Sequence, residues 1–143
     1  MLVTTHRSHP DARLLGVVHA ETSTGVLQPM TDVVRLAREH DTMILLDCVT
    51  SLGGVEVKID DWGIDAAYSC SQKCIGSPPG LAPITFSPRA VETIKKRKHQ
   101  ARSWYLDALL LDQYWTDRVY HHTSSSTLNY GLLEAQIGRA HVL

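Results

Sequence analysis

The residues of this chain best suited to covalent chemistry are a lysine and an aspartate, each placed after apolar residues. Lys73 lies in the small, polar segment 68–74 (Tyr-Ser-Cys-Ser-Gln-Lys-Cys), away from other charges, and Asp47 closes the apolar run 42–48. A lysine amine can form a Schiff base with an aldehyde, and a carboxylate can keep a pyridine nitrogen protonated so that the ring accepts electrons. The two residues together are what pyridoxal phosphate chemistry requires.

Each of these residues also has an ordinary structural explanation. Asp47 could cap a turn, which is the commoner role for an aspartate at such a position. Lys73 could be a surface lysine, as most lysines are. The absence of neighbouring charges around Lys73 instead favours a partly buried, reactive amine.

The elements that must position these residues follow from hydrophobic patterning. Residues 14–19 and 42–48 are predicted strands, and an amphipathic helix is predicted to begin at Pro29 between them. The second strand is apolar throughout, so we expect it to be buried on both faces, as in a parallel sheet. Further strands are predicted at 65–69 and 81–87, and a helix at 88–98 with Pro88 as the cap. Residues 104–115 are predicted as a second amphipathic segment, and residues 128–137 as the start of a further helix. The fold class is therefore α/β, with a mostly parallel sheet flanked by helices.

In an open α/β sheet, ligands bind beyond the carboxyl ends of the strands. Thr22 follows the first predicted strand, Asp47 ends the second, and Gln72 and Lys73 follow the third. We therefore expect Asp47 and Lys73 at the same sheet edge, facing each other across a gap of roughly 10 Å or less, with Thr22 and Gln72 beside that gap.

Composition argues against several other classes of function. The chain has 143 residues with a net charge of −1, which indicates one domain and neither a nucleic-acid nor a membrane-surface partner. The basic run 95–98 could be a nucleic-acid patch, but a solvated helix end explains it better. His121 and His122 could suggest a metal, but adjacent side chains on an extended chain point to opposite faces. Cys70 and Cys74 lack the second ligand pair of a zinc site, so no metal is expected.

Five segments occur in an order that is typical of one enzyme family. They are His-Ala-Glu-Thr-Ser-Thr-Gly-Val-Leu-Gln-Pro at 19–29, Leu-Asp-Cys-Val-Thr-Ser-Leu-Gly-Gly at 46–54, Ser-Cys-Ser-Gln-Lys at 69–73, Pro-Pro-Gly at 78–80 and Tyr-His-His-Thr at 120–123. Across about residues 10–136, the chain resembles the class V aminotransferases, specifically the alanine–glyoxylate, serine–pyruvate and serine–glyoxylate aminotransferases.

The resemblance implies roles at the cofactor ring for three residues. Lys73 resembles the Schiff-base lysine, which also moves a proton between substrate and cofactor. Asp47 matches the partner of the pyridine nitrogen, and Val49 matches the residue that packs against the ring. The implied cofactor is pyridoxal 5'-phosphate.

Four more residues match positions around the rest of the cofactor. Thr22 matches a hydroxyl beside the phenolic oxygen, and Gln72 resembles a side chain that contacts the phosphate. Tyr120 and Thr123 match a pair that reaches the phosphate of the neighbouring subunit. The resemblance therefore implies a homodimer with shared sites.

The resemblance also implies that part of the family's fold is missing. Residues 1–136 would be part of the large domain of a fold-type I pyridoxal phosphate enzyme, truncated at both ends. The upstream phosphate loop would precede Met1, and the arginine that binds the substrate carboxylate would follow Leu143. Residues 137–143 depart from the family and look like a non-native tail.

The implied reaction is transfer of an amino group from alanine or serine to glyoxylate or pyruvate, so small amino acids and 2-oxo acids are the expected partners. Two alternatives remain open, namely a lyase or desulfurase on the same fold and an inactive fragment. Three cysteines without a disulfide pattern make the cytoplasm the default location, with peroxisome or mitochondrion open for a eukaryotic source.

Overall fold

The computed structural model describes residues 8–140, with side chains described through residue 137. The elements in chain order are β1 (Leu14–Val18), α2 (Met30–Glu39), β2 (Met43–Asp47), α3 (Ile59–Trp62), β3 (Ala66–Tyr68), β4 (Ile84–Phe86), α4 (Pro88–Lys95), α5 (Ala108–Thr116) and α6 (Ser126–Ala140). Every strand expected from the sequence is present. The short helix α3 was not predicted, because its four residues are too few to display a helical period.

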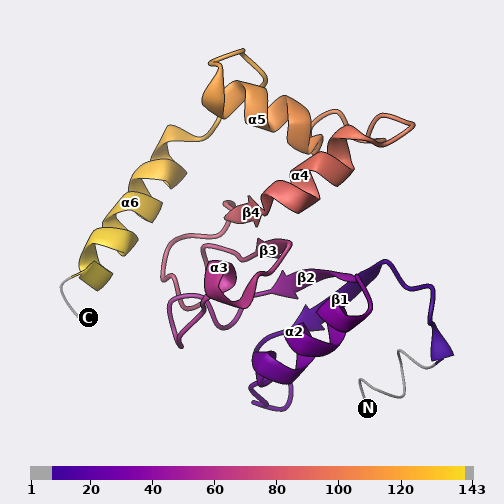
Figure 1. Ribbon diagram of the computed structural model, residues 1–143. Coiled ribbons are helices and arrows are strands. Elements are labelled where there is room, and N and C mark those ends of the chain that lie inside the picture. Colours follow the sequence, from indigo (N-terminus) through magenta and orange to yellow (C-terminus); the bar gives the residue numbers. More distant parts are fainter. Residues whose placement is uncertain (1–7, 141–143) are drawn as a thin grey trace.

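The four strands form one sheet in the order β1-β2-β3-β4, as Figure 1 shows. The first three strands are parallel and β4 runs antiparallel to β3. The connection from β3 to β4, residues 69–83, contains no helix, whereas parallel neighbours are usually joined by a helical crossover. Backbone hydrogen bonds from Ser69 to Pro83 and from Ser71 to Leu81 continue this antiparallel pairing beyond β3. The predicted α/β class with a mostly parallel sheet is confirmed.

Helix α2 covers one face of the sheet and closes the core. It starts one residue after Pro29, and its buried side chains are Met30, Val33, Val34 and Ala37. These pack against Ile44 and Leu46 of β2 and Ala67 of β3, among others. The amphipathic helix predicted to begin at Pro29 is therefore confirmed, and its apolar stripe faces the sheet as helical periodicity requires.

The expectation that β2 is buried on both faces is wrong for the described chain. Ile44 and Leu46 are buried, whereas Met43, Leu45 and Asp47 are only partly covered. The same open face continues onto β1, where Leu14 is 55% and Val18 44% exposed. Among the described residues, only the face toward α2 is packed over β1 and β2, so an apolar strand with two apolar faces has one of them uncovered.

The region after β4 contains α4, α5 and α6, which lie away from α2 (Figure 1). The cap of α4 is Ser87 rather than Pro88, because the Ser87 hydroxyl accepts a hydrogen bond from the Ala90 amide while Pro88 occupies the first helical turn. Helix α5 begins later than predicted because Asp107 caps it, accepting from the Leu109 amide.

Helix α6 begins two residues before the predicted start at residue 128 and continues past residue 137. The expected non-native tail at 137–143 lies partly within this helix, and residues 141–143 lie outside the described residues. Between residues 8 and 140, no helix has both the length and the apolar character needed to cross a membrane.

Candidate active site

The sheet register brings the end of β2 and the end of β3 side by side. Asp47 is the Cα partner of Tyr68 in the parallel β2–β3 pair, and Tyr68 is in turn the partner of Ile84 on β4. Because both parallel strands end here, Asp47 and the segment that carries Lys73 lie at the same edge of the sheet. This is the edge at which the sequence predicts a site.

Two donors hold the Asp47 carboxylate. Its Oδ1 accepts a hydrogen bond of 2.8 Å from the backbone amide of Val49, and its Oδ2 accepts one of 2.7 Å from the hydroxyl of Tyr68. The first bond is the turn-capping role that is common for aspartate. The second comes from another strand and is not explained by capping. A carboxylate has about four lone-pair sites, so acceptor capacity remains on this half-buried group.

The Tyr68 phenol and the Cys48 thiol beside Asp47 both stay protonated near neutral pH. The hydrogen bond to the Asp47 carboxylate raises the pKa of Tyr68, and partial burial adds to this effect. Burial raises the pKa of the Cys48 thiol, and the charge of Asp47 adds a smaller contribution in the same direction. Tyr68 is therefore a stable hydrogen-bond donor, and Cys48 is a poor nucleophile.

Lys73 lies on a turn whose base is firmly held. Ser71 is fully buried, its hydroxyl donates to the carbonyl of Pro78 at 2.6 Å, and its carbonyl accepts from the amide of Ser77. Lys73 itself is exposed, as is Gln72. The partly buried amine expected from the sequence is therefore not what the described chain contains.

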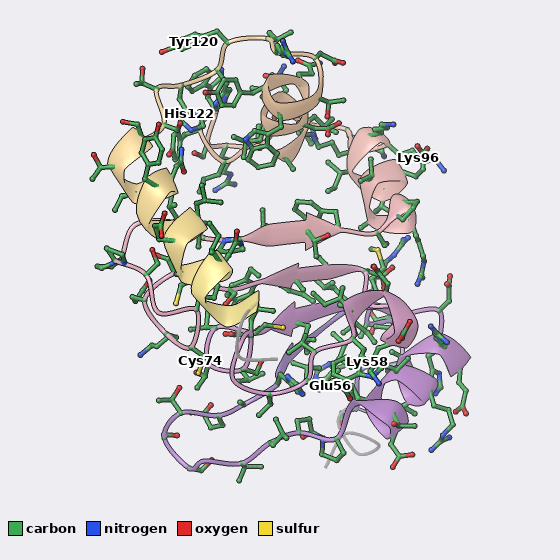
Figure 2. All side chains as sticks on the ribbon, turned by 90° about the vertical axis from the view of Figure 1, so that its left-hand side faces the viewer. Glu56, Lys58, Cys74, Lys96, Tyr120 and His122 are labelled. Carbon is green, nitrogen blue, oxygen red and sulfur yellow. The ribbon has the colours of Figure 1, made fainter. Side chains whose placement is uncertain are left out.

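The turn that carries Lys73 packs against the loop that follows β2. A Cβ atom built on Gly54 would come within 2.7 Å of Cys74 Sγ and 3.2 Å of Cys74 Cβ. Gly54 therefore allows a close approach that a larger residue would prevent. Figure 2 shows Cys74 on the side of the molecule where the parallel strands end.

Thr22 and Val49 complete the group at this edge. The Thr22 hydroxyl lies 2.7 Å from the hydroxyl of Thr50, so the loops after β1 and β2 are joined by a side-chain hydrogen bond. Val49 is half-buried, and its backbone amide donates to Asp47. The loops after three parallel strands thus supply a hydroxyl pair, a carboxylate and an amine to one edge.

Tyr120 lies far from Cys74, which follows Lys73 in the chain (Figure 2). Tyr120 is 74% exposed, and its hydroxyl lies 2.9 Å from that of Thr123, so the two form an exposed hydroxyl pair. Between them, His121 is buried and stacks on Trp104 with ring centroids 3.8 Å apart. The buried histidine anchors the segment that presents the two hydroxyls.

The expectation that His121 and His122 point to opposite faces is wrong. Their Nδ1 atoms lie 2.8 Å apart. Residues 117–125 are irregular rather than a strand, so the alternation of side chains along an extended chain does not apply. Among the residues that the structure describes, no group of three or more His, Cys, Asp or Glu could hold a metal ion.

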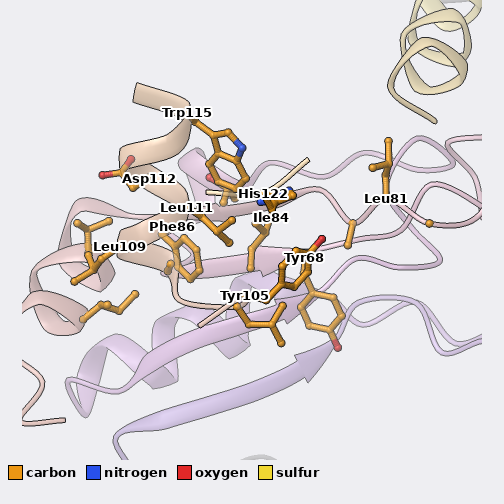
Figure 3. Close-up of a pocket in the computed structure, with 17 residues that line it drawn as sticks. Tyr68, Leu81, Ile84, Phe86, Tyr105, Leu109, Leu111, Asp112, Trp115 and His122 are labelled. Atoms are coloured by element: carbon orange, nitrogen blue, oxygen red, sulfur yellow. The ribbon is translucent and has the colours of Figure 1, made fainter. Parts of the chain in front are cut away.

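A cavity of about 730 Å³ lies between β4, α4 and α5. Figure 3 shows the residues that line it. It is lined mainly by apolar residues, including Ile84, Phe86 and Trp115. Asp47, Lys73 and Thr22 are absent from its lining, whereas the ring of Tyr68 contributes to it. The cavity is therefore separate from the group at the sheet edge, and Tyr68 connects the two.

Sequence reasoning gave no role to Tyr68 or to Thr50. The signal for Tyr68 was its position at the end of a predicted strand that neighbours the Asp47 strand, but only the register shows that the two residues are paired. Thr50 follows Asp47 closely in the chain, but its contact with Thr22 joins loops 28 residues apart.

Comparison with known proteins shows extensive similarity. A family model described as aminotransferase class-V matches residues 3–126. The alanine–glyoxylate aminotransferase of Drosophila melanogaster is 47% identical over 124 residues, which cover 83% of this chain and 32% of that protein. The (S)-ureidoglycine–glyoxylate transaminase of Bacillus subtilis is 36% identical over 141 residues, covering 85% and 34%. The chain thus spans about a third of the length of these curated relatives.

Solved structures agree with these matches. The crystal structure of an alanine–glyoxylate aminotransferase from Nostoc superimposes with a TM-score of 0.92 at 49% identity, covering 98% of this chain and 37% of that one. A cysteine desulfurase from Thermococcus onnurineus reaches a TM-score of 0.73 at 15% identity, which shows a shared fold alone.

Proposed function

Because this chain belongs to the class-V aminotransferase family, whose members are pyridoxal phosphate enzymes, we propose that it is the cofactor-binding part of a transaminase that uses glyoxylate as the amino acceptor. In this proposal the chain is the central part of a longer polypeptide, called the longer protein below, which continues it to the length of its relatives. The observation that carries the proposal is the placement of Asp47 and the Lys73 turn at the carboxyl edge of two adjacent parallel strands.

The residues at this edge fit the cofactor in chemical type. Pyridoxal phosphate supplies an aldehyde that bonds covalently to amines and a ring that accepts electrons from the substrate's Cα. Lys73 offers an exposed primary amine for the aldehyde. Asp47 offers a carboxylate with unused lone pairs for the ring nitrogen, and Val49 is an apolar neighbour for the ring face.

Lys73 has a second proposed task, as the base that moves a proton from the substrate's Cα. Thr22, joined to Thr50, is proposed to orient a hydroxyl toward the cofactor's phenolic oxygen. Gln72 is proposed to contact the phosphate.

The proposed acceptor is better supported than the proposed donor. Glyoxylate appears in the names of both curated relatives described above, whereas their amino donors are alanine and (S)-ureidoglycine. We propose alanine or serine as the donor, since the relatives with higher identity in sequence and in structure are alanine–glyoxylate enzymes. Pyruvate remains a proposed second acceptor.

We further propose that the longer protein is a homodimer in which Tyr120 and Thr123 contact the cofactor phosphate of the other subunit. Two observations support this. The hydroxyl pair is exposed and already joined, and its Tyr120 lies far from Cys74, the neighbour of Lys73, within the same chain (Figure 2).

The test uses the longer protein with borohydride reduction in the presence of pyridoxal phosphate. Mass spectrometry of the digested protein is expected to locate the cofactor on Lys73. Lys73→Ala is expected to remove this adduct and to abolish transamination from alanine or serine to glyoxylate. Lys58→Ala is the control, because Lys58 lies at the start of α3 and pairs with Glu56. Full activity of Lys73→Ala, without an added amine to rescue it, would overturn the proposal.

A further inference from the structure

We propose that Tyr68 is a positioning residue, which holds the Asp47 carboxylate in the orientation that meets the ring nitrogen of the cofactor. This inference rests on the proposed function, but the observation behind it, the hydrogen bond from Tyr68 to Asp47, is separate from the one that carries that proposal. It concerns a side chain that neither the sequence motifs nor the roles assigned above include.

The register makes the contact specific. Tyr68 is the Cα partner of Asp47, and paired residues of neighbouring strands place their side chains on the same face of a sheet. Ile44, Leu46 and Ala67 belong to the core on the α2 side, so Asp47 and Tyr68 both lie on the opposite face. From there the Tyr68 hydroxyl reaches Asp47 Oδ2 at 2.7 Å.

Two hydrogen-bond donors fix the orientation of a carboxylate that one donor leaves free to rotate. The terminal torsion of an aspartate side chain is soft, so a carboxylate held at one oxygen still rotates. The Val49 amide holds Oδ1 and the Tyr68 hydroxyl holds Oδ2, which sets the plane of the group. A hydrogen bond to a charged acceptor is among the stronger ones, so the orientation is well maintained.

The donor keeps its proton through the neutral range. Its hydrogen bond to the Asp47 carboxylate, followed by partial burial, raises the pKa of Tyr68 above that of an ordinary phenol. The phenol therefore donates to Asp47 at every pH at which a transaminase would work, and it does not compete as a second anion beside the carboxylate.

The ring of Tyr68 has a packing role that can be separated from its hydroxyl. The ring lines the cavity between β4 and α5 together with Ile84, its partner on β4 (Figure 3). Tyr68→Phe keeps the ring in this cavity and removes only the donor. Tyr105→Phe is a matched control, because it removes a hydroxyl from the same cavity.

The first experiment measures the dissociation constant of pyridoxal phosphate for the longer protein. Tyr68→Phe is expected to raise this constant roughly tenfold, as the loss of a hydrogen bond to a charged group does. Tyr105→Phe is expected to leave it unchanged. A Tyr68→Phe constant equal to that of the unchanged protein would overturn the positioning role.

A double-mutant cycle separates positioning from general packing. If Tyr68 acts through Asp47, then adding Tyr68→Phe to Asp47→Asn is expected to change the dissociation constant of pyridoxal phosphate less than twofold. An effect of equal size on both backgrounds would show that Tyr68 acts independently of Asp47, and the inference would be wrong.

A third readout needs no cofactor. The ultraviolet absorbance of tyrosinate, taken as the difference between the unchanged protein and Tyr68→Phe, reports the titration of Tyr68. Asp47→Asn is expected to lower this pKa toward that of an ordinary phenol, because the carboxylate no longer accepts the bond. An unchanged titration would show that the contact is absent in solution.

Borohydride trapping distinguishes the failure of this inference from the failure of the proposed function. Trapping of the cofactor on Lys73, together with an unaltered constant in Tyr68→Phe, would refute only the role of Tyr68. Trapping elsewhere would refute the proposed function and this role with it.

Discussion

Asp47 shows how little of a residue's function is determined by its type. In this chain it accepts a hydrogen bond from the Val49 amide, as an ordinary turn-capping aspartate does. It also accepts one from Tyr68 on the neighbouring strand, and it retains unused lone pairs on an incompletely packed sheet face. The same carboxylate therefore ends a strand and still has acceptor sites for a further donor.

The residue-scale prediction concerns the charge of Asp47. In the longer protein, Asp47→Asn is expected to keep the covalent bond between Lys73 and the cofactor, because that bond is formed by the lysine amine and the cofactor aldehyde, and the amide oxygen can still accept from the Val49 amide. It is expected to lower kcat roughly a hundredfold or more, since a neutral amide does not hold the ring nitrogen protonated. Steady-state kinetics with alanine and glyoxylate would measure this. Asp117→Asn, at an exposed acid after α5, is the control. A kcat close to that of the unchanged protein would contradict the role of Asp47.

At the scale of elements, the turn that carries Lys73 is positioned by contact with the loop after β2. Gly54 and Cys74 approach so closely that a Cβ on Gly54 would lie 2.7 Å from the Cys74 sulfur. The two loops follow adjacent parallel strands, so this contact joins the loop after Asp47 to the turn that carries Lys73.

Gly54→Ala is expected to force these loops apart and to destabilise the fold by about 1–3 kcal/mol, as overpacking does. Denaturant unfolding would measure this, and the dissociation constant of pyridoxal phosphate should rise in parallel. Gly16→Ala is the matched control, because an added Cβ there would meet nothing within 4 Å. Adding Cys74→Ala to Gly54→Ala is expected to restore part of the loss. Equal stability of Gly54→Ala and Gly16→Ala would contradict this account of the loops.

A second prediction at this scale concerns the junction of α4 and α5. Burial alone would raise the pKa of Asp107, but hydrogen bonds from Arg97 and from the Leu109 amide outweigh it and leave that pKa below its ordinary value. A folded-state pKa below the unfolded one adds stability that is present above the unfolded value and is lost as the pH falls through the folded one.

The attachment of α5 is therefore expected to weaken below about pH 4, the ordinary range of an aspartate. The fluorescence of Trp104 and Trp115, which flank and belong to α5, would follow this change. Asp107→Asn is expected to reduce the acid-dependent part of the change, and Asp117→Asn to leave it unaltered. An identical acid transition in Asp107→Asn would contradict the role of this ion pair.

At the scale of the whole molecule, the chain spans about a third of its relatives' length, and the described residues leave several apolar surfaces open. Leu14 and Val18 on the sheet face and Tyr130 and Leu133 on α6 are apolar or aromatic residues that are well exposed in the described chain. Lys73 is exposed as well. The proposed cofactor site would have to exclude water, and the described residues alone leave its lysine open to solvent.

The purified 143-residue chain is accordingly expected to be poorly soluble or to dimerise badly, and to show no transamination from alanine or serine to glyoxylate. The longer protein is expected to be active. Activity measured side by side, with size-exclusion chromatography to give the oligomeric state, would test this. Colour on adding pyridoxal phosphate does not count as activity, because exposed lysines react with the aldehyde nonspecifically. Comparable rates for the two proteins would show that the remaining two thirds of the relatives' length is dispensable.

The sequence by itself determined the α/β class, the strand–helix–strand unit that begins the chain, and the position of Asp47 and the Lys73 segment at strand ends. These depend on local quantities. Hydrophobic periods distinguish α2 from β2, and parallel strands joined by a helix must end at the same edge. The ordered motifs also sufficed to identify the family to which the chain belongs.

Only the tertiary structure decided which residues meet. The Asp47–Tyr68 bond depends on the register of two strands, the Thr22–Thr50 contact on the approach of two loops, and the contact of His121 with His122 on an irregular backbone. Burial was likewise decided by packing, since β2 is apolar on both faces yet covered on one, and Lys73 has no covering element among the described residues. Register, loop approach and coverage arise from contacts between segments distant in the chain, and no local pattern of residue types encodes them.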